Sequence, residues 1–138
     1  MTDLLYVALG SNLGDREATL ANARAAIAAI RGSRVVAEST IEETDPIGPI
    51  PQARYLNQMV AVETTLPPRA FLSALQRIER AAGRVRSTRW GPRTLDLDIV
   101  VIEGKELSDK LLTVPHPELP KRDFWQRELD ELRVALHV

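Results

Sequence analysis

The sequence predicts an α+β fold whose elements follow the order βαββαβ. Two segments with a helical spacing of apolar residues, 16–31 and 67–83, alternate with short apolar and β-branched runs of strand length. The two central strands, residues 34–43 and 55–66, are joined by a loop without a crossover helix, so we expect them to pair antiparallel. These observations indicate an antiparallel sheet that carries both helices on one face.

The first strand and helix are predicted by a change of periodicity near Gly10. Residues 4–9 are a continuous apolar run that ends at this glycine, which is typical of a buried strand. The sequence GSNLGDR follows and lacks the GxxxxGK[ST] pattern of a phosphate-binding loop, so we interpret it as a turn with Asp15 or Asn12 as the helix cap. The alanine-rich helix then begins, and its apolar face consists of Leu20, Ala23, Ile27 and Ile30.

The middle of the chain predicts two strands separated by an irregular loop. Residues 34–43 are β-branched and partly alternating, whereas residues 44–54 contain three prolines and a glycine. Loops carried on a rigid scaffold often bind ligands, and this loop could cover a sheet edge. Residues 55–66 then alternate as a strand, with Asn57 as a polar residue near its start. Asn57 is a satisfied buried amide, a turn contact or a hydrogen-bonding partner for a heterocycle.

The second half of the chain predicts a helix, a strand, a hairpin and a terminal helix. Prolines at 67–68 open the helix, because proline is tolerated in a first turn. Residues 95–102 form the next strand, residues 107–114 return after a turn, and residues 124–138 place leucines at helical spacing. The buried stripe of the helix after the prolines consists of Phe71, Leu72, Leu75 and Ile78.

Together these elements predict a ferredoxin-like βαββαβ antiparallel sheet with helices on one face and an added hairpin and C-terminal helix. A length of 138 residues fits a single domain, residues 1–138. The net charge of −1 gives no global basic field for nucleic acid, and the absence of cysteine excludes disulfides and thiolate metal sites. Neither a signal peptide nor a run of ~20 apolar residues is present, so we expect a cytoplasmic protein without a membrane span.

The most informative stretch for chemistry joins an arginine-rich loop to an acidic strand. Asp96 and Asp98 alternate with Leu95, Leu97 and Ile99, so the two carboxylates lie about 7 Å apart on one face while the apolar residues point into the core. Carboxylate oxygens suit hard cations such as Mg2+, and arginine forks suit phosphate oxygens. The arginines just upstream are Arg84, Arg86, Arg89 and Arg93.

Each half of this stretch also has an ordinary explanation. A DxD pair on a strand is common by chance, and arginines in a loop are usually a solvated face. Here, however, a loop that contains Trp90, Gly91 and Pro92 leads directly into the acidic strand. Solvation alone does not require that order, so the stretch favours phosphoryl-transfer chemistry.

Four segments, in order, carry a resemblance to a known family over nearly the whole chain: GSNLGDR at 10–16, TDPIGPIPQARYLN at 44–57, RWGPRTLDLDIV at 89–100 and LTVPHPELPKRDF at 112–124. They resemble the 6-hydroxymethyl-7,8-dihydropterin pyrophosphokinases of folate biosynthesis. The resemblance implies transfer of diphosphate from ATP to the hydroxymethyl group of the pterin, with release of AMP. It also implies two Mg2+ ions held by Asp96 and Asp98.

The resemblance assigns roles to individual residues of this chain. It implies that Arg84 and Arg93 are catalytic. The implied ATP-binding residues are Leu72, Gln76, Glu79, Arg86, Trp90, Ile99, Thr113, His116 and Arg122. The implied pterin-binding residues are Thr44, Ile47, Tyr55, Asn57, Trp90 and Phe124. The implied partners are ATP and hydroxymethyldihydropterin, without nucleic acid or membrane, and we expect a monomer. The family usually has an apolar tail with a proline where this chain has Glu128.

Two other functions are compatible with a ferredoxin-like sheet. One is RNA binding, which needs aromatic residues on the central strands, whereas only 4% of this chain is aromatic. The other is a two-metal nucleotidyl transferase, which would act on nucleic acid or a second nucleotide and would lack a pterin pocket. Formation of AMP from ATP in the presence of the pterin distinguishes the pyrophosphokinase from both.

Overall fold

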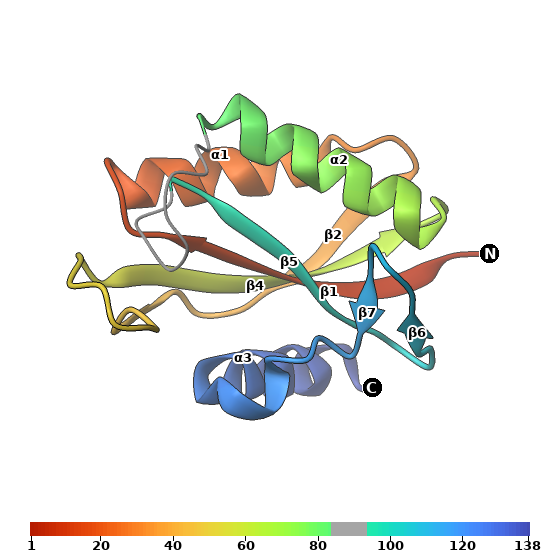
Figure 1. Cartoon of the computed structure of the whole chain (residues 1–138). Helices are drawn as coiled ribbons and strands as arrows, with labels where there is room; N and C mark the ends of the chain where they lie inside the picture. The colour runs from red at the N-terminus through yellow and green to blue at the C-terminus, as the bar shows by residue number, and fades with distance from the viewer. Residues whose placement is uncertain (84–93) are drawn as a thin grey trace.

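The computed structural model describes residues 1–83 and 94–138, and within them it has an antiparallel sheet and helices on both of its faces (Figure 1). The predicted α+β class is therefore confirmed. In chain order the elements are β1 (Asp3–Ser11), α1 (Arg16–Ala28), β2 (Ser33–Glu38), β3 (Glu42–Thr44), β4 (Tyr55–Thr64), α2 (Pro68–Ala81), β5 (Asp96–Ile102), β6 (Leu107–Ser108), β7 (Thr113–Val114), a 3-10 turn (Leu119–Lys121) and α3 (Asp123–Leu136).

The main sheet has the strand order β2-β4-β1-β5, and the short strand β3 pairs with the other end of β4. All of these pairings are antiparallel. The register places Gly10 of β1 opposite Asn57 of β4 on one side and opposite Asp96 of β5 on the other. The end of β1 and the starts of β4 and β5 therefore meet at the same end of the sheet.

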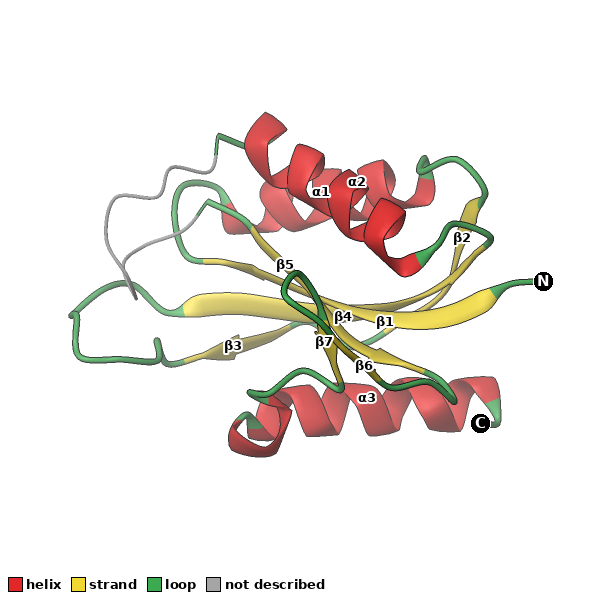
Figure 2. Ribbon diagram, turned by 45° about the vertical axis from the view of Figure 1, so that its right-hand side comes forward, coloured by secondary structure: helices red, strands yellow, loops and turns green. Residues whose placement is uncertain are grey.

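Each face of the sheet has its own apolar core. Helices α1 and α2 cover one face, and α3 covers the other (Figure 2). The core under α1 and α2 includes Leu5, Val7 and Leu9 of β1, whereas the core under α3 includes Tyr6 and Ala8 of the same strand. This alternation is the period of two that a strand imposes on its side chains.

The prediction of one strand over residues 34–43 was wrong, because the chain forms two strands there. Ser39 lies between β2 and β3, and its backbone N–H donates to the carbonyl of Met59 at 2.9 Å. Its hydroxyl accepts from the Met59 N–H at 2.9 Å, and its carbonyl accepts from the Gln58 side chain at 2.8 Å. These side-chain bonds interrupt the ladder, so that Glu42 begins a separate strand.

Two other boundaries differ slightly from the predictions. Helix α1 ends at Ala28 rather than at residue 31, and the chain turns at Gly32, whose φ of 73° favours glycine. Strand β4 ends at Thr64 rather than at residue 66. Among the described residues, the structure contains no helix that is both long and apolar enough to cross a membrane.

Candidate active site

The two predicted metal ligands lie on the α3 face of the sheet. Asp96 and Asp98 are both half-buried, whereas Leu95, Leu97 and Ile99 are at most 5% exposed and belong to the core under α1 and α2. The predicted alternation along β5 is therefore confirmed. Asp98 lies opposite Ala8, which faces α3, so the two carboxylates share that face.

A buried carboxylate from α2 holds the backbone between these aspartates. Glu79 is 8% exposed, and its Oε2 accepts a hydrogen bond of 2.8 Å from the backbone N–H of Leu97. A charged acceptor makes a stronger hydrogen bond than a neutral one. Glu79 therefore fixes the position of β5 at the residue that separates Asp96 from Asp98.

Gly10 lies at the centre of the candidate site. A Cβ atom at this position would come within 3.3 Å of Asn57 Oδ1 and 3.4 Å of Tyr55 Cδ1. The absence of a side chain therefore leaves room between Asn57 on one neighbouring strand and Asp96 on the other. A flat ligand group could approach the sheet backbone at this point.

The candidate pterin-binding residues Thr44, Tyr55 and Asn57 lie together at this end of the sheet. Asn57 is 6% exposed and donates a hydrogen bond of 2.5 Å from its Nδ2 to Thr44 Oγ1. Thr44 lies directly opposite Tyr55 in the β3–β4 register. Of the other two described pterin candidates, Ile47 is 40% exposed in the loop, and Phe124 is half-buried at the start of α3, with its ring 6.3 Å from that of Trp125.

The turn after β1 also positions the loop that residues 45–54 form. Asp15, and not Asn12, caps α1, because its side chain accepts from the Ala18 N–H at 3.1 Å. Asn12 is 4% exposed, and its Nδ2 donates to Gln52 Oε1 at 2.7 Å and to the Ala53 carbonyl at 2.9 Å. Asn12 thus ties the loop to the end of β1.

His116 approaches Asp98 from the segment after β7. Its Nδ1 accepts from the backbone N–H of Glu118 at 3.0 Å, so a neutral imidazole carries its proton on Nε2. Nε2 lies 3.7 Å from Asp98 Oδ1, which is beyond direct hydrogen-bonding distance. Burial, and secondarily Arg122, lowers the pKa of His116, while Glu118 opposes them. The neutral form is therefore favoured at pH 7.

Trp125 connects His116 to Arg122. The His116 ring meets the Trp125 ring edge-on with centroids 4.9 Å apart, and the Arg122 guanidinium carbon lies 4.3 Å from the Trp125 ring centroid. These are the geometries of an aromatic pair and a cation–π contact. The buried indole, 2% exposed, thereby contacts both the Arg122 guanidinium and the imidazole that lies beside Asp98.

The other predicted ATP-binding residues that the structure describes are spread over several elements. Leu72 packs against the core under α1 and α2, Gln76 is exposed on α2, and Thr113 is exposed on β7. The Ile99 side chain is 2% exposed in the same core as Leu72, so a ligand could meet this residue only through its backbone. The backbone N–H and C=O groups of alternate strand residues point to the same side. The backbone groups of Ile99 therefore point to the outer edge of β5, as the Leu97 N–H does.

Four candidates from the arginine-rich stretch fall outside the described residues. They are Arg84, Arg86, Trp90 and Arg93. Their roles stay predictions from the sequence.

The described residues are compatible with Mg2+. In the part of the chain that the structure describes, no group of three or more His, Cys, Asp or Glu side chains could enclose a metal ion. Mg2+ is usually held by one or two carboxylates, with substrate phosphates and water completing the octahedron. A pair of half-buried aspartates on one strand face matches that requirement when a polyphosphate supplies the other ligands.

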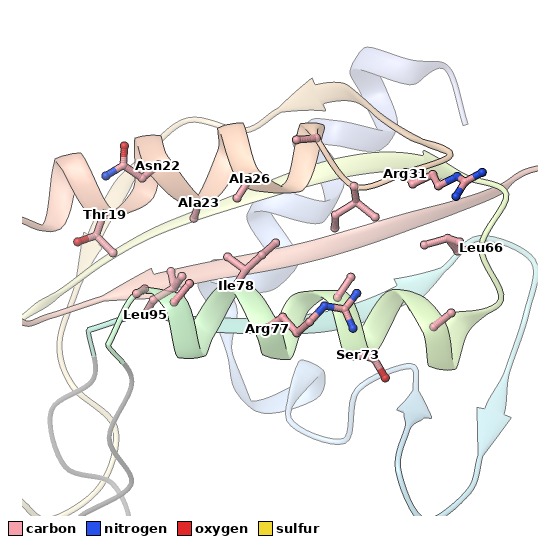
Figure 3. Close-up of a pocket in the computed structure, with 16 residues that line it drawn as sticks. Thr19, Asn22, Ala23, Ala26, Arg31, Leu66, Ser73, Arg77, Ile78 and Leu95 are labelled. Atoms are coloured by element: carbon pink, nitrogen blue, oxygen red, sulfur yellow. The ribbon is translucent and has the colours of Figure 1, made fainter.

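A separate cavity of about 960 Å3 lies between α1 and α2 (Figure 3). Alanine is the commonest residue of its walls, and the larger apolar residues are Ile30, Leu66, Ile78 and Leu95. It lies on the helix face of the sheet, opposite the face that carries the two aspartates. We therefore do not assign it to the candidate site.

Three contributors to the site were missed by reasoning from the sequence: Gly10, the contact of Asn12 with the loop, and Trp125. Gly10 was interpreted only as the end of a strand, although a glycine inside a strand is a signal of close approach to a ligand or another backbone. Asn12 and Trp125 act through residues that are distant in sequence. The sequence alone contained no signal for those contacts.

The fold and the candidate site define a class of protein: an α+β protein with paired carboxylates on the sheet face where Gly10 lies opposite Asn57 and Asp96. Comparison with known proteins identifies the family. Residues 6–134 match the family model described as 7,8-dihydro-6-hydroxymethylpterin-pyrophosphokinase. The chain belongs to this family, as its motifs predicted.

Three relatives carry the name 2-amino-4-hydroxy-6-hydroxymethyldihydropteridine pyrophosphokinase. The protein from Bacillus subtilis is 42% identical over 132 residues, which cover 96% of this chain and 79% of the relative. The protein from Methylorubrum extorquens is 45% identical, with 96% and 84% covered. The protein from Pseudomonas aeruginosa is 44% identical, with 100% and 85% covered.

Proposed function

We propose that this chain transfers diphosphate from ATP to 6-hydroxymethyl-7,8-dihydropterin in folate biosynthesis, giving AMP and the dihydropterin methyl diphosphate. Membership of the pyrophosphokinase family supports this reaction. The observation that carries it in the structure is the register across Gly10, which brings a candidate pterin-binding amide beside a candidate metal-binding carboxylate. The hydroxymethyl group of a pterin held at Asn57 would then face the phosphates held at Asp96.

The pterin is a flat heterocycle with an amide-like edge. Asn57 and Thr44 offer polar groups in a nearly buried setting, and Tyr55 offers an adjacent ring. Hydrogen bonds to a polar edge together with ring stacking would orient the substrate. Ile47, Phe124 and Trp90 would complete this pocket.

The diphosphate end of the site would be built around Asp96 and Asp98. Two Mg2+ ions held there would neutralise charge on the phosphate oxygens and orient the incoming hydroxyl. Arg84 and Arg93 would steady the transferred group, because guanidinium forks match phosphate oxygens. Glu79 would keep the two carboxylates in place through its bond to the Leu97 N–H.

The nucleotide would lie along the outer edge of β5. His116 and Arg122, which Trp125 holds together, would contact its phosphates, and the backbone of Ile99 would offer a donor and an acceptor. The remaining residues that we propose for this role are Leu72, Gln76, Glu79, Arg86, Trp90 and Thr113.

We further propose that the chain is a single domain, residues 1–138, with a ferredoxin-like topology, and that it acts as a cytoplasmic monomer. The order of the strands and helices supports that topology. RNA binding is not supported, because Tyr6, the aromatic residue of β1 on the α3 face, is 0% exposed beneath that helix.

The test is formation of AMP from ATP with and without 6-hydroxymethyl-7,8-dihydropterin, each with Mg2+ and with excess chelator. We expect AMP only when pterin and Mg2+ are both present, in equal amounts with the pterin diphosphate. Formation of ADP, or of AMP that is independent of the pterin, would contradict the proposed reaction.

A further inference from the structure

Helix α3 buries a carboxyl group that the proposed reaction does not use. Glu128 is 2% exposed and lies on the helix face that also buries Trp125, Leu129 and Leu132. Neither of its carboxyl oxygens has a hydrogen-bond donor among the described residues. Burying an ionised carboxylate that has no hydrogen-bond donor costs free energy of folding. We therefore asked which neighbour of Glu128 could favour its protonated form.

A second carboxyl group, that of Glu42 on β3, lies beside Glu128. Its Oε1 is also buried without a donor in the described part of the chain, and the side chains of Glu42 and Glu128 are close enough to share a hydrogen bond. Two carboxylates can only accept hydrogen bonds, so they cannot bond to each other when both are ionised. One proton placed on Glu128 makes it a donor to Glu42 and removes the repulsion between them.

The surrounding charges favour Glu42 as the ionised partner. Arg127 donates to Glu42 Oε2 at 3.3 Å, which stabilises a carboxylate there. The charged groups that act on Glu128 are Glu42 of β3 together with Arg127 and Glu131 of α3. Burial, followed by the hydrogen bond to Glu42, raises the pKa of Glu128 to about 9. The carboxylate of Glu131 is instead occupied by Thr40, whose N–H and hydroxyl donate to Oε2 at 2.9 and 3.1 Å.

Glu42 is part of the strand that carries Thr44. Strand β3 spans only three residues and pairs with β4, where Glu42 lies opposite Asn57. Residues two apart on a strand share a face, so Glu42 and Thr44 both point to the α3 side. A hydrogen bond from α3 to Glu42 therefore acts on the same short strand that Thr44 and Asn57 hold together.

We propose that the protonated carboxyl of Glu128 is a positioning residue, which donates a hydrogen bond to Glu42 and thereby holds β3, with Thr44 and Asn57, in the geometry that binds the pterin. The role in pterin binding rests on the proposed function, whereas the protonated pair itself does not. Because Glu128 acts through Glu42, it should affect pterin binding without affecting ATP binding.

The first experiment tests the proton directly. Infrared difference spectra between pH 7 and pH 10 should contain the band of one buried protonated carboxyl in the wild type. The band should be absent in Glu128→Gln and present in Asp130→Asn, a control that changes an exposed carboxylate of the same helix. A wild type without the band, or a band that survives in Glu128→Gln, would overturn the protonated pair.

The second experiment tests positioning through the separate KM values of the two substrates. Glu128→Gln keeps a donor without a titrating group, so its KM for the pterin should stay near that of the wild type at pH 7. Glu128→Leu removes the donor and should raise the KM for the pterin about tenfold, the effect of one lost hydrogen bond, with the KM for ATP unchanged. In the wild type the KM for the pterin should also rise above pH 9, and in Glu128→Gln it should rise less.

Two results would overturn the positioning role. One is that Glu128→Leu changes the KM for ATP as much as the KM for the pterin. The other is that the KM for the pterin has the same pH dependence in the wild type and in Glu128→Gln up to pH 10. If Glu128→Leu fails to fold, this pH comparison with Glu128→Gln decides the question. If the wild type forms no AMP, the proposed function and the positioning role both fail, while the infrared band still decides the protonated pair.

Discussion

The carboxylate of Glu79 accepts a hydrogen bond of 2.8 Å from the backbone N–H of Leu97, the residue that separates Asp96 from Asp98. This contact joins α2 to the outer side of β5, which is an edge strand of the sheet. An edge strand lacks a neighbour on one side, so its position depends more on individual side-chain contacts. Glu79 is therefore a structural support for the two aspartates as well as a candidate contact of the nucleotide.

We expect Glu79→Ala to destabilise the protein and to lower its activity. The Leu97 N–H would lose its acceptor in a nearly buried position, which costs about 1–3 kcal/mol in the free energy of unfolding. Urea denaturation measures this loss, and Gln76→Ala on the exposed face of the same helix should show little of it. A Glu79→Ala protein as stable as the wild type would mean that the bond contributes nothing to the position of β5.

Asp96→Asn and Asp98→Asn should each abolish turnover and leave the fold intact. Both side chains are half-buried on the sheet face and lie outside the core under α1 and α2, so replacing them by isosteric amides removes charge without creating a cavity. The loss of metal charge stabilisation should reach several kcal/mol in the activation free energy. Steady-state kcat at several Mg2+ concentrations, with thermal unfolding as the control for folding, measures both effects. Activity above a few per cent with a normal Mg2+ dependence would contradict the assignment.

Regular periodicity is what made much of this structure predictable. The alternation along β5 put Asp96 and Asp98 on one face and Leu97 in the core, because a strand has only two faces. Proline at the start of α2 marked that helix correctly, because proline fits a first turn. These features depend on neighbours in the sequence.

Features that depend on distant neighbours were not predictable. Ser39 divides the expected strand because its hydroxyl and backbone bond to Met59, which no local pattern reveals. Helical periodicity places Glu128 on the same face of α3 as Trp125 and Leu132, but it does not reveal which side chain its carboxyl meets there. Only the packing of α3 against β3 brings Glu128 to Glu42.

Gly10→Ala should weaken pterin binding more than ATP binding. The added Cβ would lie 3.3 Å from Asn57 Oδ1, closer than such atoms normally pack, so the Asn57 side chain or the strands must shift. We expect the KM for the pterin to rise about tenfold or more, in line with an overpacking cost of about 1–3 kcal/mol, and the KM for ATP to change little.

A double-mutant cycle is the control for this prediction. If the clash with Asn57 is the cause, Gly10→Ala should have a smaller effect in an Asn57→Ala background. Additive effects of the two substitutions on the pterin KM would mean that Gly10 acts through another neighbour, such as Tyr55.

The free energy of unfolding should depend on pH through Glu128. Its pKa is about 9 in the folded protein, against an ordinary value of 4.5, so between these two values the folded state holds one more proton than the unfolded state. The stabilisation from the protonated group is complete below pH 4.5, falls as pH rises, and is lost above pH 9. The maximal slope is about −1.4 kcal/mol per pH unit.

Glu128→Gln has no titrating group at this position, so its stability relative to the wild type should increase steadily from pH 5 to pH 9. Urea denaturation at intervals of one pH unit measures the difference, and Asp130→Asn should follow the wild type because that carboxylate is exposed. Parallel stability curves for the wild type and Glu128→Gln would show that Glu128 is ionised in the folded protein. In that case the buried Glu42 Oε1 would need a donor other than Glu128, while the contacts of Arg127 with Glu42 and of Glu131 with Thr40 would remain.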